Sequence, residues 1–386
     1  MAAGLEQLKA LEAAHLMPTY KRLPVEFVSG SGAELLDAQG NTYIDMLAGI
    51  AVDNAGHCHP DVVAAIREQA GKLIHVSNLF YTEPGIRLAE FLSTTSLGGQ
   101  VFLCNSGAEA NEAAIKLARR NKPGGGFVVL EGAFHGRTIG ALSATPQPEK
   151  QAAFAPLLEG FKSVCADADA ISAVVNDTTA AVLIEPIQGE GGVYPIHDNV
   201  LVAAREACDR HGALLIFDEV QTGAGRTGTL WGYEQTSVVP DAMTVAKGVG
   251  GGVPTGALIA HSDIAEVFHA GDHGSTFAGG PLISAAALAA LGVVSDPDLL
   301  AEVKLKGERL RSGLKAIGSV VRVRGRGLMI GADIEGDAPG VVQRALLEHH
   351  LVINATGPKT LRFVPPLVIT DQQIDSALDS LSLLLS

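Results

Sequence analysis

The sequence predicts an α/β protein built on a mostly parallel central sheet that helices cover. Between about residues 100 and 260, short apolar runs alternate with glycine-rich or polar turns and with stretches of helical periodicity, a pattern typical of parallel strands joined by helices. The runs are apolar throughout, which indicates strands that are buried on both faces. Composition agrees, since 47% of residues are hydrophobic, only 5% are aromatic, and 45 glycines supply tight turns.

The length of the chain predicts two packed units. At 386 residues it exceeds what one hydrophobic core usually supports. Residues 15–48 carry short alternating runs around a Gln39-Gly40-Asn41 turn, typical of antiparallel hairpins. Helices and strand-like runs follow from residue 282, and a helix from Asp371 closes the chain. We therefore predict a large domain at 49–281 and a smaller α+β domain formed by 1–48 and 282–386.

Net charge and cysteine content limit which binding partners and which cellular location are expected. The net charge is −14 with a pI near 5.3 and no dense basic run, so nucleic acid and anionic membranes are not expected partners. Four cysteines without a CxxC pair indicate reduced thiols in the cytoplasm. The first residues lack the apolar core of a signal peptide. The apolar run 282–294 is shorter than the ~20 residues of a membrane span and is expected to be a buried helix.

The carboxyl ends of the predicted strands are the place to look for a site. Open parallel sheets bind ligands beyond these ends. The five runs are VFLCN (101–105), FVVLE (127–131), AVLIE (181–185), ALLIFD (213–218) and AMTVA (242–246). Polar residues at or just after these runs are Ser106, Glu131, Glu185, Asp218 and Lys247.

The segment SGAEANEAAIKLARR (106–120) opens a helix after the first run. Ser106 and Glu109 have the spacing of a capping box, and a capped helix is the simplest interpretation. The alternative is an anion site, because the amides of Gly107 and Ala108 would point outward at the positive end of the helix.

Asp218 and Lys247 end two of the runs. A buried carboxylate needs a cationic partner; Asp218 could cap a helix or form a structural ion pair, or it could face a protonated pyridine nitrogen. Glu219 is expected to point to the other face. Lys247 precedes a glycine-rich turn, where burial could lower its pKa enough for attack on an aldehyde. A nucleotide loop is not supported, because the GxxxxGK[ST] and GxGxxG patterns are missing.

Two arginines are candidates for holding carboxylates. In FHGRT (134–138), Phe134 could be a core residue or a flat surface for a planar cofactor, and Arg137 could grip a carboxylate with both guanidinium N–H groups. Arg362 could do the same, with Glu190 as its counter-ion when no ligand is bound. Surface ion pairing is the alternative for each.

A metal site is not expected. His57, Cys58 and His59 lie close in sequence, but alternation within a short loop directs their side chains apart, and no second ligand cluster exists. His135 and His273 are interpreted as hydrogen-bonded structural residues, and no GxSxG elbow of a serine hydrolase is present.

Taken together, several strings resemble the class III aminotransferases of the fold type I pyridoxal 5′-phosphate (PLP) enzymes: SGAEANEAAIK, FHGRT, EPIQGEGG, DEVQTGAGRTG, AKG and HGSTFAGGPL. The resemblance spans nearly the whole chain. NLFYTEPGIRLAE, ALSATPQPEKQAAFAPLLEGF and GPKTLRFVPPLVIT are most similar to the branch that acts on N2-acetylornithine. One departure is Gly280, where the family usually has Asn.

The resemblance implies a role for each matching residue. Lys247 would carry PLP covalently, and the cofactor would further contact Gly107 and Ala108 (phosphate), Phe134 (ring face), Asp218 (pyridine nitrogen), Glu219, Val220, Gln221 (ring hydroxyl) and Thr276, which would reach the cofactor phosphate of a neighbouring subunit. Arg137, helped by Ser275, would bind the α-carboxylate of acetylornithine. Arg362, paired with Glu190, would bind the carboxylate of glutamate or 2-oxoglutarate.

The implied reaction moves the terminal amino group of N2-acetylornithine to 2-oxoglutarate, giving N-acetylglutamate 5-semialdehyde and glutamate, in arginine biosynthesis. The freed Lys247 would move a proton in a ping-pong mechanism, and a homodimer would share its active sites. Ornithine, succinyl-diaminopimelate or 4-aminobutyrate are alternative substrates within the family. A PLP aminomutase or decarboxylase, or a non-catalytic PLP-fold protein, are alternatives outside it; the Glu190 and Arg362 pair argues against the first two.

Overall fold

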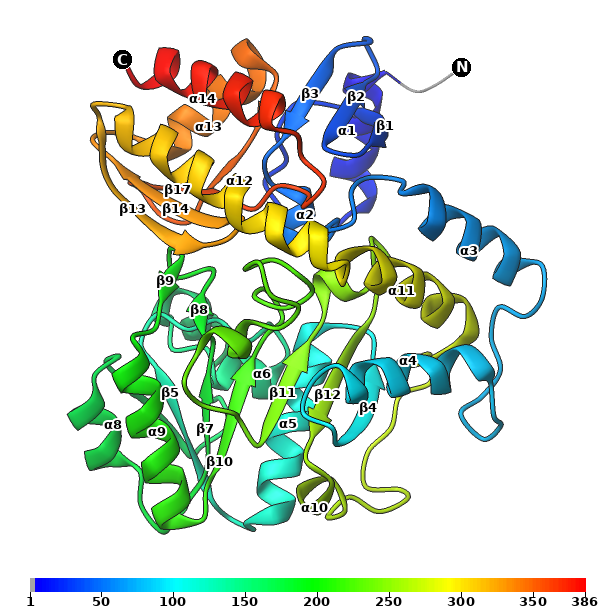
Figure 1. Ribbon diagram of the computed structural model, residues 1–386, viewed down its shortest axis with the longest axis vertical. Coiled ribbons are helices and arrows are strands. Elements are labelled where there is room, and N and C mark those ends of the chain that lie inside the picture. Colours follow the sequence, from blue (N-terminus) through cyan, green and yellow to red (C-terminus); the bar gives the residue numbers. More distant parts are fainter. Residues whose placement is uncertain (1–3) are drawn as a thin grey trace.

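A seven-stranded sheet forms the centre of the larger part of the molecule in the computed structural model, which describes residues 4–386 (Figure 1). Its strand order is β4-β12-β11-β10-β7-β5-β6, and every pairing is parallel except the two made by β12. The strands are β4 (Gln100–Cys104), β5 (Gly126–Leu130), β6 (Phe161–Val164), β7 (Thr179–Ile184), β10 (Leu214–Asp218), β11 (Ala242–Val245) and β12 (Gly256–Ala260). The predicted mostly parallel α/β fold is confirmed.

Each of the five predicted apolar runs forms a strand of this sheet, whereas β6 and β12 were not predicted. In β6, an edge strand, Lys162 and Ser163 are exposed, so it lacks an apolar run. β12 follows the glycine-rich turn closely and is short, which hid it within the predicted loop.

Both faces of the sheet are buried. Alternate residues of one strand enter two different hydrophobic clusters: Leu215 and Phe217 of β10 pack in one, and Leu214 and Ile216 in the other. Helix α5 (Gly107–Asn121) packs against the second cluster, while α8 (Ala168–Val174) and α9 (Asp198–His211) pack against the first. This double burial explains why the runs are apolar throughout.

Strands from the two chain ends lie in one smaller sheet. β1 (Phe27–Ser31), β2 (Glu34–Asp37) and β3 (Thr42–Asp45) form the predicted antiparallel hairpins, and β15 (Leu351–Val352) pairs parallel with β3. A second four-stranded sheet contains β13 (Val320–Arg326), β14 (Met329–Ile334), β16 (Asn354–Ala355) and β17 (Thr360–Phe363). Figure 1 shows both sheets above the large one. The domain boundaries at 48 and 281 stay predictions.

Helices surround these sheets and connect the two parts. Those not yet named are α1 (Leu5–His15), α2 (Ala48–Ala51), α3 (Pro60–Ala70), α4 (Glu83–Thr94), α6 (Ile139–Ser143), α7 (Pro148–Gln151), α10 (Ser262–Ala265), α11 (Pro281–Val294), α12 (Pro297–Ala316), α13 (Ala338–His349) and α14 (Asp371–Leu385). A two-stranded ladder joins β8 (Ile187–Gln188) to β9 (Tyr194–Pro195), and short 3₁₀ turns occupy 152–154, 232–235 and 247–249.

Helix α11 is largely buried, as predicted for the apolar run that it contains. Gly280 is its N-cap residue and supplies no side-chain cap, so the usual Asn would add a capping group that this chain lacks. Within residues 4–386, no single helix is both long and apolar enough to span a membrane; α11 and α12 reach that composition only together, and they are bent by 65° relative to each other.

Candidate active site

A cavity of about 610 Å³ lies where the carboxyl ends of β7, β10 and β11 meet the N-terminus of α5. Most residues that were predicted to bind a cofactor line it, namely Gly107, Ala108, Phe134, Asp218, Val220, Gln221 and Lys247, together with Arg137. The topology therefore brings together side chains that lie up to 140 positions apart in the sequence (247 − 107). The expectation that the site follows the strand ends agrees with this placement.

The N-terminus of α5 forms one wall. The Ser106 hydroxyl accepts the N–H of Glu109 at 3.2 Å, while the Glu109 carboxylate accepts the N–H of Asn105 at 2.8 Å. In a complete capping box the Glu109 carboxylate would accept the N–H of Ser106. Here it accepts the N–H of Asn105, one residue earlier, so only the first bond of the predicted box is formed. The geometry of a helix leaves the N–H groups of Gly107 and Ala108 without an intrahelical acceptor. This wall can hold an anion.

Close packing explains the glycine at the start of α5. A Cβ on Gly107 would lie 2.7 Å from Val220 Cγ1, closer than carbon atoms approach. A Cβ on Gly136, whose φ is 141°, would lie 2.9 Å from the Cβ of Ala108. Helix α5, the Val220 turn and the 134–137 loop can approach one another only with small residues at these points.

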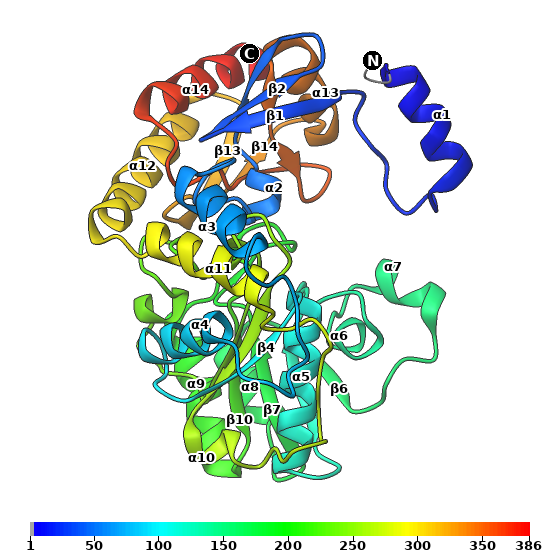
Figure 2. The ribbon, with the colours of Figure 1, turned by 90° about the vertical axis from the view of Figure 1, so that its right-hand side faces the viewer.

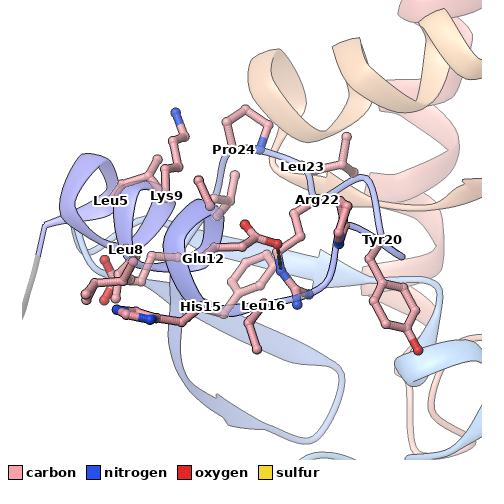
Figure 3. Close-up of a pocket in the computed structure, with 16 residues that line it drawn as sticks. Leu5, Leu8, Lys9, Glu12, His15, Leu16, Tyr20, Arg22, Leu23 and Pro24 are labelled. Carbon is pink, nitrogen blue, oxygen red and sulfur yellow. Dashed lines mark hydrogen bonds and ion pairs between the residues drawn. The ribbon is translucent and has the colours of Figure 1, made fainter.

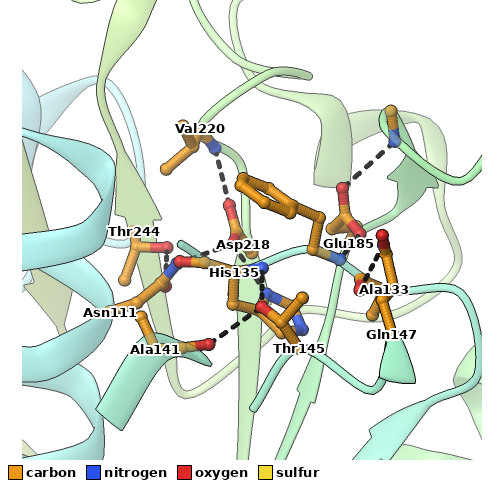
Figure 4. Close-up of polar contacts among 12 residues, drawn as sticks. Asn111, Ala133, His135, Ala141, Thr145, Gln147, Glu185, Asp218, Val220 and Thr244 are labelled. Carbon is orange, nitrogen blue, oxygen red and sulfur yellow. Dashed lines mark hydrogen bonds and ion pairs between the residues drawn. The ribbon is translucent and has the colours of Figure 1, made fainter. Parts of the chain in front are cut away.

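Asp218 is the centre of a buried hydrogen-bond network on the cavity floor (Figure 4). Its Oδ2 accepts Asn111 Nδ2–H and His135 Nδ1–H, both at 2.8 Å, and its Oδ1 accepts the N–H of Val220 at 3.0 Å. Thr244 Oγ1 donates to Asn111 Oδ1 at 2.8 Å and so fixes the orientation of that amide. The carboxylate is held in place, and it lines the cavity.

His135 takes part in this network more closely than the sequence suggested. It was interpreted as structural, and its hydrogen bond to Asp218 makes it a direct support of the cavity floor. Its Nε2 is buried and has no hydrogen-bond partner within the described residues. No local pattern marked this contact, because His135 follows β5 and Asp218 ends β10, and β7 lies between these two strands.

Glu185, which the sequence marked only as a strand end, joins two loops of the site. Its Oε2 accepts the N–H of Phe134 at 3.0 Å, and its Oε1 accepts the N–H of Gly189 at 3.1 Å. Burial raises the pKa of this carboxyl to about 7, opposed in part by His135. Through this carboxylate the loop that bears Arg137 is tied to the loop that bears Glu190.

Lys247 lies at the end of β11, facing the cavity. Burial lowers the pKa of its amine from the ordinary value, although the carboxylates of Glu190 and Asp218 oppose the shift. Its φ of 47° is left-handed, an uncommon conformation for a residue other than glycine. A Cβ on the next residue, Gly248, would collide with the side-chain amide of Asn54. The turn therefore holds a partly desolvated amine in a fixed position.

Arg362 lies beside this cavity and is fully buried. Its Nη1 donates to Glu190 Oε1 at 2.5 Å and to Gln221 Oε1 at 3.3 Å, and its Nε donates to Asn354 Oδ1 at 3.2 Å. Burial by itself would raise the pKa of Glu190, but the Arg362 guanidinium outweighs it and lowers that pKa. The Nη2 of Arg362 is buried without a hydrogen-bond partner among the described residues, so its N–H groups can donate to an anionic ligand.

Phe134 has two cations near its ring. The guanidinium carbon of Arg137 lies 5.7 Å from the ring centroid and the Nζ of Lys150 lies 5.8 Å from it, distances typical of cation–π contacts. Arg137 is exposed at the edge of the cavity. It is therefore free to meet a carboxylate that enters from solvent.

Besides Arg362 and Glu190, three predicted site residues do not line the cavity. The carboxylate of Glu219 is turned away from the cavity, as the residues alone predicted, and accepts the N–H groups of Gly232 and Tyr233. A role of Glu219 in cofactor binding stays a prediction. Ser275 contacts Asn105 Nδ2 at 2.9 Å, and Thr276 is exposed. Neither lines the cavity of its own chain.

The His57-Cys58-His59 loop has a structural explanation. His57 Nε2 lies 2.6 Å from Asp45 Oδ2, and His59 Nδ1 accepts the N–H of Asp61 at the start of α3. Cys58 is exposed. Within residues 4–386, no group of three or more His, Cys, Asp and Glu side chains is placed to hold a metal ion.

The residues of the cavity fit PLP, on the evidence of their chemistry. The start of α5 offers amides for a phosphate, Asp218 offers a fixed carboxylate for a pyridine nitrogen, and Lys247 offers an amine of lowered pKa for an aldehyde. These are three different groups of one cofactor. Arg362 and Arg137 add two separate places for carboxylates.

Comparison with known proteins agrees with this arrangement. The model of the family "Aminotransferase class-III" matches residues 16–385. An acetylornithine aminotransferase of Caldanaerobacter subterraneus subsp. tengcongensis is 48% identical over 387 residues, covering 97% of this chain and 98% of that protein.

Two solved structures are similar over nearly the whole chain. The N-acetylornithine aminotransferase of Stenotrophomonas maltophilia K279a has a TM-score of 0.82 at 38% identity and covers 97% of both chains. The ornithine aminotransferase of Toxoplasma gondii, described with partial occupancy of PLP at its active site, has a TM-score of 0.94 at 32% identity, covering 99% of this chain and 94% of the other.

Proposed function

Because the chain belongs to the class III aminotransferase family, we propose that it transfers the terminal amino group of N2-acetylornithine to 2-oxoglutarate. The products are N-acetylglutamate 5-semialdehyde and glutamate, and the pathway is arginine biosynthesis. The relatives named acetylornithine aminotransferase support this substrate. The buried pair of Arg362 and Glu190 beside the Lys247 cavity is the observation that supports a dicarboxylate as the second substrate.

PLP is the cofactor of this family, and the cavity residues fit its groups. When bound, PLP supplies an electron sink that stabilises negative charge on the carbon that bears the amino group. We assign Lys247 to its aldehyde, Asp218 to its pyridine nitrogen and Gln221 to its ring hydroxyl. The amides of Gly107 and Ala108 serve its phosphate. Phe134 covers one face of the ring, and Val220 packs against the start of α5.

Lys247 has two tasks in this proposal. Burial lowers the pKa of its amine, which favours the uncharged form that a nucleophile must have. With PLP and a substrate bound, its Nζ would hold and move the proton of the carbon that bears the substrate nitrogen. Asp218, fixed by Asn111 and His135, would lie opposite the ring nitrogen.

Two arginines let one cavity bind two different substrates. Arg137, exposed at the cavity edge, binds the α-carboxylate of acetylornithine. Arg362 remains neutralised by Glu190 while acetylornithine is bound, because the reacting end of that substrate has no carboxylate. It takes the second carboxylate of glutamate or 2-oxoglutarate on its unpartnered Nη2. An aminomutase or decarboxylase would not need this second site. A substrate with no acyl group, such as ornithine or 4-aminobutyrate, or with a succinyl group, remains the alternative within the family.

The site is proposed to be completed by a second copy of the chain. Ser275 and Thr276 lie outside their own cavity, and Ser275 lines a groove of about 540 Å³ that Leu79, Phe80 and Tyr81 also border. These three side chains are 85%, 66% and 97% exposed, which is costly for a lone chain. A homodimer would cover them and bring Thr276 to the cofactor phosphate of the partner.

The dimer is tested by Tyr81→Lys, which places a charge in the exposed apolar patch. Light scattering should give twice the monomer mass for the unmodified protein and a shift toward monomer for the variant, with a matching loss of activity. A monomeric unmodified protein with full activity would contradict the shared site.

The four cysteines are free thiols, which supports the proposed cytoplasmic location.

The function itself is tested by absorbance spectroscopy of the purified protein. The visible band of lysine-bound PLP should be present, glutamate should bleach it, and 2-oxoglutarate should restore it. A band that glutamate cannot bleach would reject transamination with glutamate. Bleaching by glutamate but not by N2-acetylornithine would reject the proposed substrate.

A further inference from the structure

Glu190 lies in the loop between β8 and β9, and Figure 1 shows β9 beside β13 of the smaller part. The backbone bonds within this loop are long, since the N–H groups of Gly192 and Val193 both reach the carbonyl oxygen of Gly189, at 3.3 and 3.4 Å. Val193 has a left-handed φ of 58°, which is uncommon for a β-branched residue. Contacts with surrounding elements must therefore hold the loop in this conformation.

Arg324 of β13 supplies such a contact. Its Nε donates to the carbonyl oxygen of Gly192 at 2.8 Å, and its guanidinium carbon lies 3.9 Å from the ring centroid of Tyr194, within the range of cation–π contacts. A Cβ on Gly331, which is paired with Arg324 across β13 and β14, would lie 2.8 Å from the same carbonyl oxygen. The loop therefore lies close against this sheet, and Arg324 fixes it two residues after Glu190.

The Arg324 guanidinium is also connected to the strand that carries Arg362. Its Nη1 donates to Asp333 Oδ2 at 2.5 Å, and Thr360 Oγ1 donates to Asp333 Oδ1 at 2.7 Å. Burial by itself would raise the pKa of Asp333, but the hydrogen bonds from Arg324 and Thr360 outweigh it and lower that pKa. Thr360 lies on β17 two residues before Arg362. One side chain thus joins the loop of Glu190 to the strand of Arg362.

Burial distinguishes Arg324, which is 6% exposed, from an arginine that pairs with a carboxylate at the surface. In the N-terminal arm, residues 5–26, Arg22 Nε donates to Glu12 Oε1 at 2.6 Å (Figure 3), but the Arg22 side chain is 55% exposed. Helix α1 of this arm buries none of its residues and lies beside the main body (Figure 2), although Tyr20 borders the active-site cavity. An exposed pair contributes little free energy, whereas loss of one partner of a buried pair leaves a charge unbalanced.

The two substrates of the proposed reaction use Arg362 differently. Glutamate and 2-oxoglutarate each bring a carboxylate to its guanidinium. N2-acetylornithine brings none to this place, so Glu190 must stay there to balance the buried charge. A displaced Glu190 would therefore impair the reaction of N2-acetylornithine more than that of glutamate.

We infer that Arg324 is a positioning residue that keeps Glu190 on Arg362, and that it thereby supports the substrate without a second carboxylate. Arg324 does not line the active-site cavity; it acts through the loop of Glu190. The inference rests on the proposed function. It makes a side chain outside the cavity responsible for the balance between the two half-reactions.

The test compares the two half-reactions of the PLP-loaded enzyme in Arg324→Met. Each amino donor is mixed with the enzyme, and the loss of the visible band gives the apparent Kd and the rate for N2-acetylornithine and for glutamate separately. The ratio of rate to Kd should fall about tenfold for N2-acetylornithine, because the Glu190 pair is weakened and not removed, and change less than about twofold for glutamate. Equal losses for both donors, or no loss for either, would overturn the inference while leaving the proposed function intact.

Arg324→Lys is the second variant for the case in which Arg324→Met does not fold. It keeps a positive charge beside Asp333 but lacks the planar guanidinium that reaches two acceptors at once, so the same selective loss should appear at about threefold. Hydrogen exchange of the amides of residues 189–195 should become faster in both variants, a measurement that needs no substrate. Unchanged exchange would contradict the positioning role.

Glu190→Gln separates an effect through Glu190 from a general one. A glutamine cannot balance the charge of Arg362, so the N2-acetylornithine half-reaction should fall further than in Arg324→Met. Adding Arg324→Met to Glu190→Gln should then change this half-reaction by less than about twofold. Independent losses in the double variant would show that Arg324 does not act through Glu190.

Arg309→Met is the matched control, because Arg309 also donates to a carboxylate, that of Asp375 at 2.7 Å, but it joins α12 to α14 at the surface. It should leave both half-reactions and the exchange of residues 189–195 unchanged. Failure of the proposed function would be visible in the unmodified enzyme, which would react with glutamate but not with N2-acetylornithine.

Discussion

The floor and the edge of the active-site cavity are built in opposite ways. On the floor, Asp218 is 3% exposed and accepts three hydrogen bonds, and one of its donors, Asn111, is itself held by Thr244 of the neighbouring strand. At the edge, Tyr20 is 75% exposed on an arm whose helix buries nothing. A rigid floor suits chemistry that every substrate shares, since it needs one geometry. An exposed edge suits recognition of the part in which substrates differ.

The largest expected effect comes from the floor. Lys247→Ala removes both the nucleophile and the proton carrier, so turnover should fall by at least about 10⁴-fold. The protein should still fold and bind PLP without the visible band of the lysine-bound form. Steady-state assays and spectra check both. Lys162→Ala, on an exposed edge strand, is the matched control. Full activity of Lys247→Ala would contradict the role of Lys247 as nucleophile and proton carrier.

A smaller loss of activity is expected from a change at Glu185, which connects the loops of the cavity. Glu185→Gln leaves one acceptor for two backbone N–H groups, so either Phe134 or Gly189 loses its bond. Because these loops carry Arg137 and Glu190, kcat/KM for both substrates should fall roughly tenfold to a hundredfold, mainly through KM. The PLP band should persist.

Glu131→Gln is the control for that change, because Glu131 also follows a strand but is exposed. A fall in kcat with KM unchanged in Glu185→Gln would indicate a direct chemical role instead of a positioning one. Unchanged kinetics would show that the two loops do not depend on this carboxylate.

The smallest expected effect concerns stability. Burial raises the pKa of Glu219 from 4.5 to about 7 in the folded protein, and its bonds to the Gly232 and Tyr233 amides only partly oppose this. Between these pH values the folded state binds more protons than the unfolded state, so the free energy of unfolding falls as pH rises. Relative to Glu219→Gln, the unmodified protein should lose stability from about pH 4.5 to about pH 7.

Urea unfolding at several pH values measures this difference. Glu206→Gln, at an exposed position of α9, should show the same pH dependence as the unmodified protein. If the difference between the unmodified protein and Glu219→Gln did not vary with pH, the carboxyl would not titrate in this range. Activity at a fixed pH should change little, since the side chain of Glu219 lies outside the cavity.

The sequence predicted the floor of the cavity better than its edge. Asp218 and Lys247 were found because each ends a continuous apolar run, a local signal that also predicted the strands. Arg362 and Glu190 are 172 positions apart; each was a candidate from its residue type, and the family resemblance supported their pairing. The contacts of Glu185 with Phe134 and of His135 with Asp218 were missed, because they join residues 51 and 83 positions apart without a pattern in either segment.

Residues at the edge left no signal at all. Tyr20 lies in a polar N-terminal stretch, and its place at the cavity depends on how the arm turns back, which Arg22 and Glu12 determine. β12 was missed for a related reason, since its antiparallel return depends on the strands beside it. Local patterns thus predicted buried strands and their ends, but not arrangements that depend on tertiary contacts.

The most direct measurement compares amino donors with 2-oxoglutarate as the common acceptor. The purified, PLP-loaded protein is assayed for glutamate formation from N2-acetylornithine, N2-succinyl-diaminopimelate, ornithine and 4-aminobutyrate. Our account predicts that kcat/KM for N2-acetylornithine exceeds that for ornithine and for 4-aminobutyrate by at least about tenfold, the value of one well-placed group at the edge. Equal or higher values for either donor without an acyl group would contradict it.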